Sequence, residues 1–298
     1  MALKKTKVEL NNAVFSLPDY VARDEGYFEK EGLDVELVEP LRRREAMGES
    51  ADPVSDPGDV KSFLWHAGFE EGEFSLYHAC EWGQMRRSQD SAIGAKVLTK
   101  RAAVSSQAII VRPDSPYNIP QDLSNVPIAV NFHAGSHYIT FGLLSGFIPR
   151  ENVNVTHIGV PNKRFEALVE GRVAAATLME PWISVAEKLG YKLIAESFYV
   201  GLEVADTSVD PETYGALDRA RKSAVKRLQE DISPYLKYLI AEIPEDVATL
   251  TSEDFHLGRL RYVDPEPYSQ EEFQKTHDWM VDWGLIKPEE YEELVASR

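Results

Sequence analysis

The chain has 298 residues, a formal net charge of -17 at pH 7 and a hydrophobic content of 43%. This length and composition are typical of a globular protein with a large core, in one domain or two lobes, and they exclude the disordered and fibrous classes. Nucleic-acid binding is not expected, because it depends on clustered lysine and arginine, and the single cysteine, Cys80, excludes an intramolecular disulfide and any multi-cysteine metal site.

The N-terminal residues MALKKTK lead directly into a candidate strand, Val8–Leu10. They contain neither the apolar run nor the small-residue cleavage site of a secretory signal. No stretch reaches the roughly 18 apolar residues of a membrane-spanning helix. We therefore expect a cytoplasmic protein without membrane insertion, and a periplasmic or extracellular one if a leader was removed from this chain.

Strands and helices alternate along the first third of the chain, which is typical of an α/β fold. The expected elements, in order, are strand Val8–Leu10, a loop to Tyr20, a helix ending at Gly32, strand Asp34–Val38, a loop or partial lid over residues 40–58, helix Asp59–Glu70 and strand Gly72–Leu76.

One segment of this part, DEGYFEKEGLDVEL at residues 24–37, combines a short helix with a strand. Tyr27 and Phe28 give it a buried face, and Gly32 suits a left-handed helix C-cap. The segment resembles the first-lobe signature of the type II solute-binding superfamily, which includes nitrate-, alkanesulfonate-, taurine- and thiamine-pyrimidine-binding proteins and the thiamine pyrimidine synthases. The resemblance runs from about Val8 to Val295. It implies two α/β lobes, each with a mostly parallel sheet, and a ligand cleft between them.

The rest of the chain continues the alternation and then becomes mostly helical from Tyr214. Its expected elements are strands Val97–Leu98, Ala108–Val111, Val126–Val130, Val153–His157, Val173–Leu178, Lys192–Ala195 and Phe198–Val200, with helices ending at Leu144, Gly171 and Gly190. We assign residues 1–107 to the first part of lobe 1, 108–198 to lobe 2, and 199–298 to a return to lobe 1 and the C-terminal helices. No internal repeat is visible.

The run NFHAGSHY follows strand Val126–Val130 and opens a helix. Gly135 allows close backbone approach, Ser136 can cap the helix, and free N–H groups at a helix N-terminus attract carboxylate, sulfonate or phosphate oxygens. The resemblance implies that this turn binds the ligand, with His133, Gly135, Ser136, His137 and Tyr138 as candidates. In the alternative, Ser136 only caps the helix and His137 is exposed.

Glu180-Pro181-Trp182 resembles the second-lobe motif of the superfamily, a small-residue strand that ends on an acid and a proline at the cleft. Glu180 could accept hydrogen bonds from an amine or a ring N–H, as could Glu203 if the ligand is cationic or zwitterionic. Trp182 could stack on a planar ligand, but packing within the lobe is favoured.

Aromatic and polar residues also lie near the predicted strand ends of the first lobe. The candidates there are Asn11, Phe15, Tyr20, Tyr77, His78 and Trp82. Such a cluster suits a planar or partly apolar ligand better than a bare ion, so we expect an organic ligand larger than nitrate.

An enzyme on the same scaffold is the alternative, with His78, Cys80, Glu81 and His137 as candidate catalytic residues. Cys80 would need a nearby base, and a buried, inert thiol is favoured. Thiamine pyrimidine synthases use a lysine, a histidine and a cysteine-rich run where this chain has Ala79 and Gly83, so their chemistry does not carry over. Nor does that of aromatic sulfinate desulfinases, because the cysteine they use near the first strand has no counterpart here.

Two functions therefore stay open from the sequence. The first is a binding protein for a small organic, planar or anionic ligand, which it would present to an ABC transporter if exported or use as a sensor. The second is a cytoplasmic lyase, decarboxylase or hydrolase acting on a small aromatic or heterocyclic acid. A scaffold protein without a cleft ranks last. We expect no cofactor and no metal, since His133 and His137 are separated by probable turn geometry.

Overall fold

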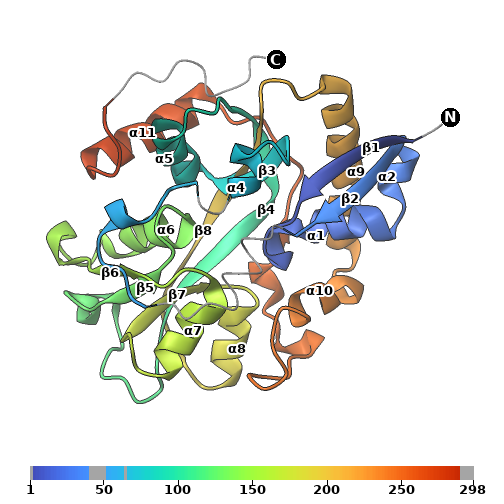
Figure 1. Cartoon of the computed structure of the whole chain (residues 1–298). Coiled ribbons are helices and arrows are strands. Elements are labelled where there is room, and N and C mark those ends of the chain that lie inside the picture. The colour runs from blue at the N-terminus through green and yellow to red at the C-terminus, as the bar shows by residue number, and fades with distance from the viewer. Residues whose placement is uncertain (1–2, 40–51, 64–65, 289–298) are drawn as a thin grey trace.

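The computed structural model describes residues 3–39, 52–63 and 66–288 (Figure 1). These residues form a mixed α/β fold with helices around a long central sheet. The strands are β1 (Lys4–Glu9), β2 (Leu33–Val38), β3 (Leu76–Cys80), β4 (Lys96–Val111), β5 (Ile128–Val130), β6 (Val155–His157), β7 (Ala175–Met179), β8 (Lys192–Ala205) and β9 (Arg261–Tyr262).

Helices surround the sheet in both halves of the molecule. They are α1 (Ala13–Asp24), α2 (Tyr27–Lys30), α4 (Ala67–Glu70), α5 (Glu81–Asp90), α6 (Gly135–Leu144), α7 (Pro161–Val169), α8 (Trp182–Lys188), α9 (Pro211–Glu230), α10 (Lys237–Ile240) and α11 (Gln270–Asp282). Short 3₁₀ turns lie at Pro57–Asp59, Pro120–Leu123, Arg150–Asn152, Ser233–Tyr235, Ser252–Asp254 and Leu257–Arg259.

The sheet order explains how the two lobes are joined. Strands β1 and β2 pair in parallel, and the larger sheet has the order β3-β8-β4-β7-β5-β6, with β9 on β4. The long strands β4 and β8 pair antiparallel and cross the centre of the molecule (Figure 1). Following the predicted boundaries, we refer to β1, β2, β3, α1, α5 and α9 as lobe 1 and to β5, β6, β7, α6, α7 and α8 as lobe 2. The residue boundaries proposed for the lobes stay a prediction.

The expected two-lobed α/β fold is confirmed, with parallel pairing inside each lobe and antiparallel pairing where the lobes join. Among the described strands, the pairs β1/β2, β5/β6 and β5/β7 are parallel, and the pairs that involve β4 or β8 are antiparallel. The chain enters lobe 2 along β4 and returns along β8, so these two strands must run in opposite directions. Antiparallel pairing therefore dominates the centre of the sheet.

Three predicted elements of the first lobe are wrong in detail. The strand expected at Gly72–Leu76 is Leu76–Cys80, and all five of its residues are buried, so it lacks the alternation that marks a half-exposed strand. The loop expected before Tyr20 is helix α1, which contains Pro18 in its interior. The helix expected at 59–70 is reduced to the turn Pro57–Asp59 and the short α4, with residues 64–65 outside the described part.

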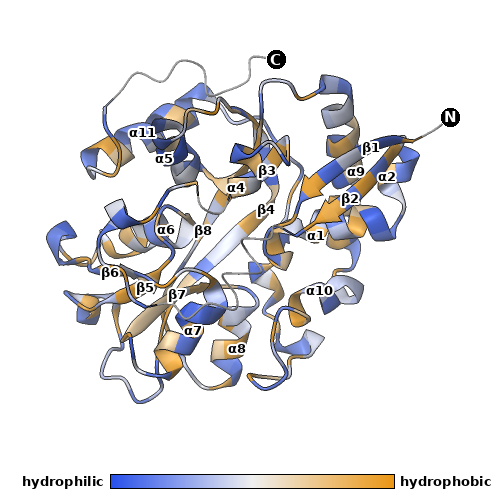
Figure 2. Ribbon diagram, in the orientation of Figure 1, coloured by the Kyte–Doolittle hydropathy of each residue, from blue (hydrophilic) through white to orange (hydrophobic). Residues whose placement is uncertain are grey.

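The lobes are built on apolar faces that meet between helices and sheet. Figure 2 shows hydrophobic residues in strands β2 and β7 and hydrophilic ones on the outer faces of the helices. In lobe 1, Arg221 of α9 forms buried ion pairs with Asp19 of α1 and Glu203 of β8. This cluster joins three elements and uses the carboxylate of Glu203, which was a candidate for holding a cationic ligand. Gly32 has φ +82°, as the predicted left-handed C-cap requires.

Candidate functional site

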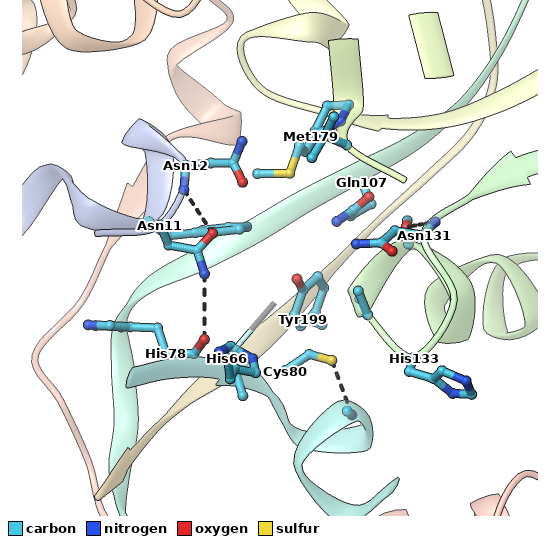
Figure 3. A pocket seen from close by; sticks show the side chains of 18 of the residues that line it. Asn11, Asn12, His66, His78, Cys80, Gln107, Asn131, His133, Met179 and Tyr199 are labelled. Atoms are coloured by element: carbon cyan, nitrogen blue, oxygen red, sulfur yellow. Dashed lines mark hydrogen bonds between the residues drawn. The ribbon is translucent and has the colours of Figure 1, made fainter. Parts of the chain in front are cut away.

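A cavity of about 120 Å³ lies between the lobes, where the carboxyl ends of several strands meet. Residues that follow or end β1, β3, β5 and β7 line it, which is where open α/β sheets bind ligands. The sequence candidates that line it are Asn11, Phe15, His78, Cys80, His133, Gly135 and Ser136. Figure 3 shows Asn11 and Asn12 on one side of it and Gln107, Asn131 and Met179 on the other, with Tyr199 between.

The two lobes present matching turns to this cavity. After β1, the Asn11 amide N–H donates to Ser16 Oγ at 2.8 Å; after β5, the Asn131 amide N–H donates to Ser136 Oγ at 2.9 Å. Each turn leads into a helix, α1 or α6. Ser136 therefore closes its turn and does not cap α6, whose N-cap residue is Ala134 without a side-chain cap. The expected capping role of Ser136 is wrong.

The N-terminus of α6 approaches Tyr199 of β8 very closely. A Cβ atom at Gly135 would overlap the Tyr199 hydroxyl, so only glycine fits at this position. The close approach at Gly135 is thus to a protein side chain, and its expected role at a ligand stays a prediction. Burial raises the pKa of Tyr199, so its hydroxyl stays protonated at neutral pH and can donate a hydrogen bond into the cavity.

Two buried arginines line the cavity, one from each side. Arg164 of α7 is 2% exposed, and its Nη1 donates to Gly159 O at 2.6 Å and to Ser136 Oγ at 3.3 Å. Burial lowers the pKa of Arg164 to about 9, which keeps it cationic at pH 7. Its Nε has no hydrogen-bond partner among the described residues.

Arg101 of β4 is the second cation. Its guanidinium lies 3.8 Å from the centre of the Phe15 ring and donates to Ser105 Oγ and Ala103 O. Burial lowers its pKa from 12.5. In the described part of the chain, neither Arg101 nor Arg164 forms an ion pair with a carboxylate.

The charge of the cavity lining is positive at pH 7. Among the described lining residues the one carboxylate is Glu9, against the two arginines. Burial lowers the pKa of His66 to about 3, that of His78 well below 6.5 and that of His133 below 6.5, so the histidines are neutral. The lining thus carries an uncompensated positive charge in a protein whose net charge is strongly negative.

The candidate catalytic residues are not brought together. The Cys80 Sγ accepts the Gly83 amide N–H at 3.2 Å, and burial raises the pKa of Cys80 to about 12. His137 lies outside the lining: its Nδ1 accepts the His133 amide N–H at 3.2 Å, and burial lowers its pKa to about 3. Glu81 also lies outside it, where it accepts hydrogen bonds from Tyr268 and Thr276.

The first-lobe aromatics expected at the ligand mostly pack elsewhere. Tyr20 stacks on Tyr238 with ring centroids 4.2 Å apart. Tyr77 is fully buried against Phe69. Trp82 lies behind the cavity, in a separate hollow.

Three further candidates lie outside the cavity lining. Tyr138 shares the separate hollow with Trp82, their ring centroids 6.0 Å apart. Trp182 packs on Phe165 at 5.5 Å, which agrees with the favoured packing role. Glu180 is buried, accepts the Ser184 amide N–H at 3.1 Å and lies 3.6 Å from Arg259.

Several lining residues were missed by sequence reasoning, chiefly Asn12, Arg101, Gln107, Arg164 and Tyr199. A signal existed for Arg101, because it interrupts a long strand that is otherwise rich in apolar and small residues. Arg164 gave none, since an arginine in a short amphipathic helix usually faces solvent. The described residues contain no group of three potential metal ligands and no helix long and apolar enough to span a membrane.

Solved structures with the same architecture identify the fold. The alkanesulfonate-binding protein SsuA from Xanthomonas axonopodis pv. citri, bound to MOPS, superposes with a TM-score of 0.72 at 16% identity, over 96% of this chain and 95% of that one. A Candida albicans gene product that defines a new family with the generic periplasmic binding protein fold gives 0.67 at 12% identity, over 97% and 92%. The fold is that of the type II periplasmic binding proteins.

The periplasmic aliphatic sulphonate binding protein SsuA from Escherichia coli shares this type II fold, with a TM-score of 0.63 at 14% identity, over 96% of this chain and 94% of that one. A family model described as NMT1/THI5 like matches residues 15–51. Comparison with curated proteins finds no match. The resemblance expected from residues 24–37 is confirmed, and the matched segment contains them.

Proposed function

We propose that this protein binds a small organic anion in the cavity between its lobes. The observation that carries the proposal is Arg164 of α7, a buried cation that lies beside the start of α6 and has no carboxylate partner among the described residues. Ser136, Tyr199 and the first amides of α6 surround the same place. A helix N-terminus and a guanidinium both attract carboxylate and sulfonate oxygens.

Energetics support an anionic ligand. Burying a charge without a partner is costly, and a folded protein normally pairs such a group. The lowered pKa of Arg164, about 9, reflects the cost of burying this charge. An anion that bound there would restore the missing partner, and contacts made to both lobes would favour the closed form.

The lining also limits the rest of the ligand. Four carboxamides, of Asn11, Asn12, Gln107 and Asn131, line the cavity. A volume of about 120 Å³ holds about four water molecules at roughly 30 Å³ each. The proposed ligand is therefore a small molecule with hydrogen-bonding groups besides its acid, and aromatic contacts are available from the rings of Phe15 and Tyr199. The Xanthomonas neighbour, an alkanesulfonate-binding protein, makes sulfonates the first class to test.

The enzyme alternative has weaker support, because Cys80 is held as a thiol and His137 and Glu81 face away from the cavity. Delivery of the ligand to an ABC transporter, a role as a sensor and the cytoplasmic location all stay predictions. Fractionation of the source cells with an antibody against this protein would test the location directly.

The proposal is tested by titration calorimetry with matched pairs of ligands. The panel is ethanesulfonate, benzenesulfonate and benzoate, with ethanesulfonamide, benzenesulfonamide and benzamide as neutral counterparts and nitrate as the bare ion. We expect at least one acid to bind and its neutral counterpart to bind at least ten-fold more weakly. A ten-fold difference in affinity corresponds roughly to the contribution of one buried hydrogen bond to a charged group. Equal binding of an acid and its amide, or tight binding of nitrate alone, would refute the proposal.

A further inference from the structure

A segment that lies in the sequence between two strands of lobe 1 contacts lobe 2 and reaches the cavity wall. Residues 52–63, here called the strap, lie in the sequence between β2 and β3, both strands of lobe 1. Yet Val54 of the strap pairs with His157 at the edge of β6 in lobe 2. Figure 1 shows this part of the chain running beside β6 and α6.

The pairing is a short but complete β-bridge. The Val54 amide N–H donates to His157 O at 3.0 Å, and the His157 amide N–H donates to Val54 O at 2.7 Å. The Thr156 hydroxyl adds a bond to Val54 O at 3.2 Å. The strap thus extends the sheet of lobe 2 beyond its edge strand.

Two more contacts hold the strap on lobe 2. His133 Nε2, on the turn after β5, lies 2.9 Å from Pro57 O. Val60 packs against the buried apolar cluster of lobe 2 that contains Leu123 and Ile128. Both backbone and side-chain contacts therefore bind a lobe 1 segment to the other lobe.

The end of the strap also forms part of the cavity wall. Ser62 lines the cavity, as does His66, which follows the strap. Ser62 Oγ and His66 Nδ1 are buried and have no hydrogen-bond partner among the described residues. Polar groups left unsatisfied in a wall of this kind are typical of a surface that a ligand completes.

We infer that the strap is a gate: it links the two lobes, and it must leave β6 before a ligand can enter or leave the cavity. Hinge opening of a two-lobed protein separates lobe 1 from lobe 2, so it breaks the Val54–His157 bridge or pulls the strap out of lobe 1. The gate rests on the proposed function, because a gate requires a ligand that enters the cavity. The experiment that tests the gate uses no ligand, so the gate and the proposed function can fail separately.

The test measures the distance between the lobes without ligand. Spin labels at Glu29→Cys on α2 and Val169→Cys on α7 report this distance by double electron–electron resonance. Both positions are exposed, whereas the native Cys80 is buried. The unsubstituted protein, which has Cys80 alone, serves as the control that Cys80 stays unlabelled. We expect one narrow distance, equal to that of the structure. A ligand-free protein dominated by longer distances would overturn the inference.

Strap variants give the second readout. Val54→Pro removes the N–H donor of the bridge, and Thr156→Val removes the hydroxyl bond at nearly unchanged volume. We expect Val54→Pro to add a population at longer distance and Thr156→Val to speed hydrogen exchange at the His157 amide by at least three-fold. Ser55→Ala, an exposed change in the same strap, should alter neither. An unchanged distance distribution in folded Val54→Pro, together with unchanged exchange in Thr156→Val, would refute the gate.

Discussion

Replacement of Arg164 by methionine tests whether this arginine serves to bind a ligand or to stabilise the fold. The pKa of Arg164 falls from 12.5 to about 9 because burial penalises the charged form. At about 1.4 kcal/mol per pKa unit this is about 5 kcal/mol against the charged group. Because the group is protonated in both the folded and unfolded states at pH 7, the whole penalty acts there, and it shrinks only as the pH rises from 9 toward 12.5.

Methionine has a similar length and no charge, so Arg164→Met removes this penalty and loses two hydrogen bonds, to Gly159 and Ser136. Bonds from a charged group contribute about 1.5–3 kcal/mol each. The difference changes the free energy of unfolding by only about -1 to +2 kcal/mol, so we expect no large loss of stability. Anion binding should fall at least about 30-fold, since the loss of a buried charge contact costs about 2–5 kcal/mol.

The matched control is Arg221→Met, at a buried arginine that pairs with two carboxylates. Arg221 is 2% exposed and bonds to Asp19 and Glu203, which raise its pKa. Its removal leaves two buried carboxylates without their partner, so we expect a loss of about 3–5 kcal/mol. Urea unfolding followed by tryptophan fluorescence measures both variants, and calorimetry measures binding. If Arg164→Met destabilises the protein as much as Arg221→Met, Arg164 is structural and the reasoning fails.

Further predictions concern single positions. Gly135→Ala should weaken anion binding at least ten-fold and destabilise by about 1–3 kcal/mol, because its methyl group meets the Tyr199 hydroxyl, whereas Gly142→Ala on the same helix, with no atom nearby, should leave calorimetric binding unchanged. Cys80, with its pKa raised to about 12, should react with Ellman's reagent at pH 8 about 1000-fold more slowly than a free thiol; rapid reaction would contradict the buried thiol. Burial raises the pKa of Glu180 to about 7, so its contribution to stability is fully present below pH 4.5 and is lost as the pH rises through 7, by about 3 kcal/mol. In urea titrations, Glu180→Gln should flatten the stability–pH curve between pH 4.5 and 7. An unchanged curve would count against a raised pKa of Glu180.

The fold could be predicted from the sequence where local chemistry decides the structure. The helix and left-handed glycine at residues 24–37, and the strand–turn–helix around Gly135, each depend on residues close together in the chain. The strand directions in the main sheet could not be predicted, because 80 residues separate β4 from β8 and their register depends on how the lobes meet. The start of α1 was hidden by Pro18, which usually argues against a helix interior.

The candidate site could be predicted only in part, for a similar reason. Residues that follow a strand, such as Asn11, His78 and His133, were found because strand ends converge on a cleft. Arg101 and Arg164 were missed because each is buried by elements distant in sequence. Conversely, Trp82 and Tyr138 follow or neighbour the right strands, but helix periodicity turns them to the opposite side.

The two matching turns differ in what lies at their helix ends, and this difference orients the proposed ligand. At α1, the first amide N–H, that of Ala13, already donates to Glu242 at 2.7 Å, so a protein carboxylate occupies that helix end. At α6 no side chain caps the helix, and Arg164 stands beside it. The acid of the ligand then belongs at lobe 2, and its neutral hydrogen-bonding end at lobe 1, near Asn11. A neutral extension at the end away from the acid should therefore change affinity through lobe 1 residues alone, so Asn11→Ala should alter discrimination among the panel acids while Arg164→Met weakens them all alike.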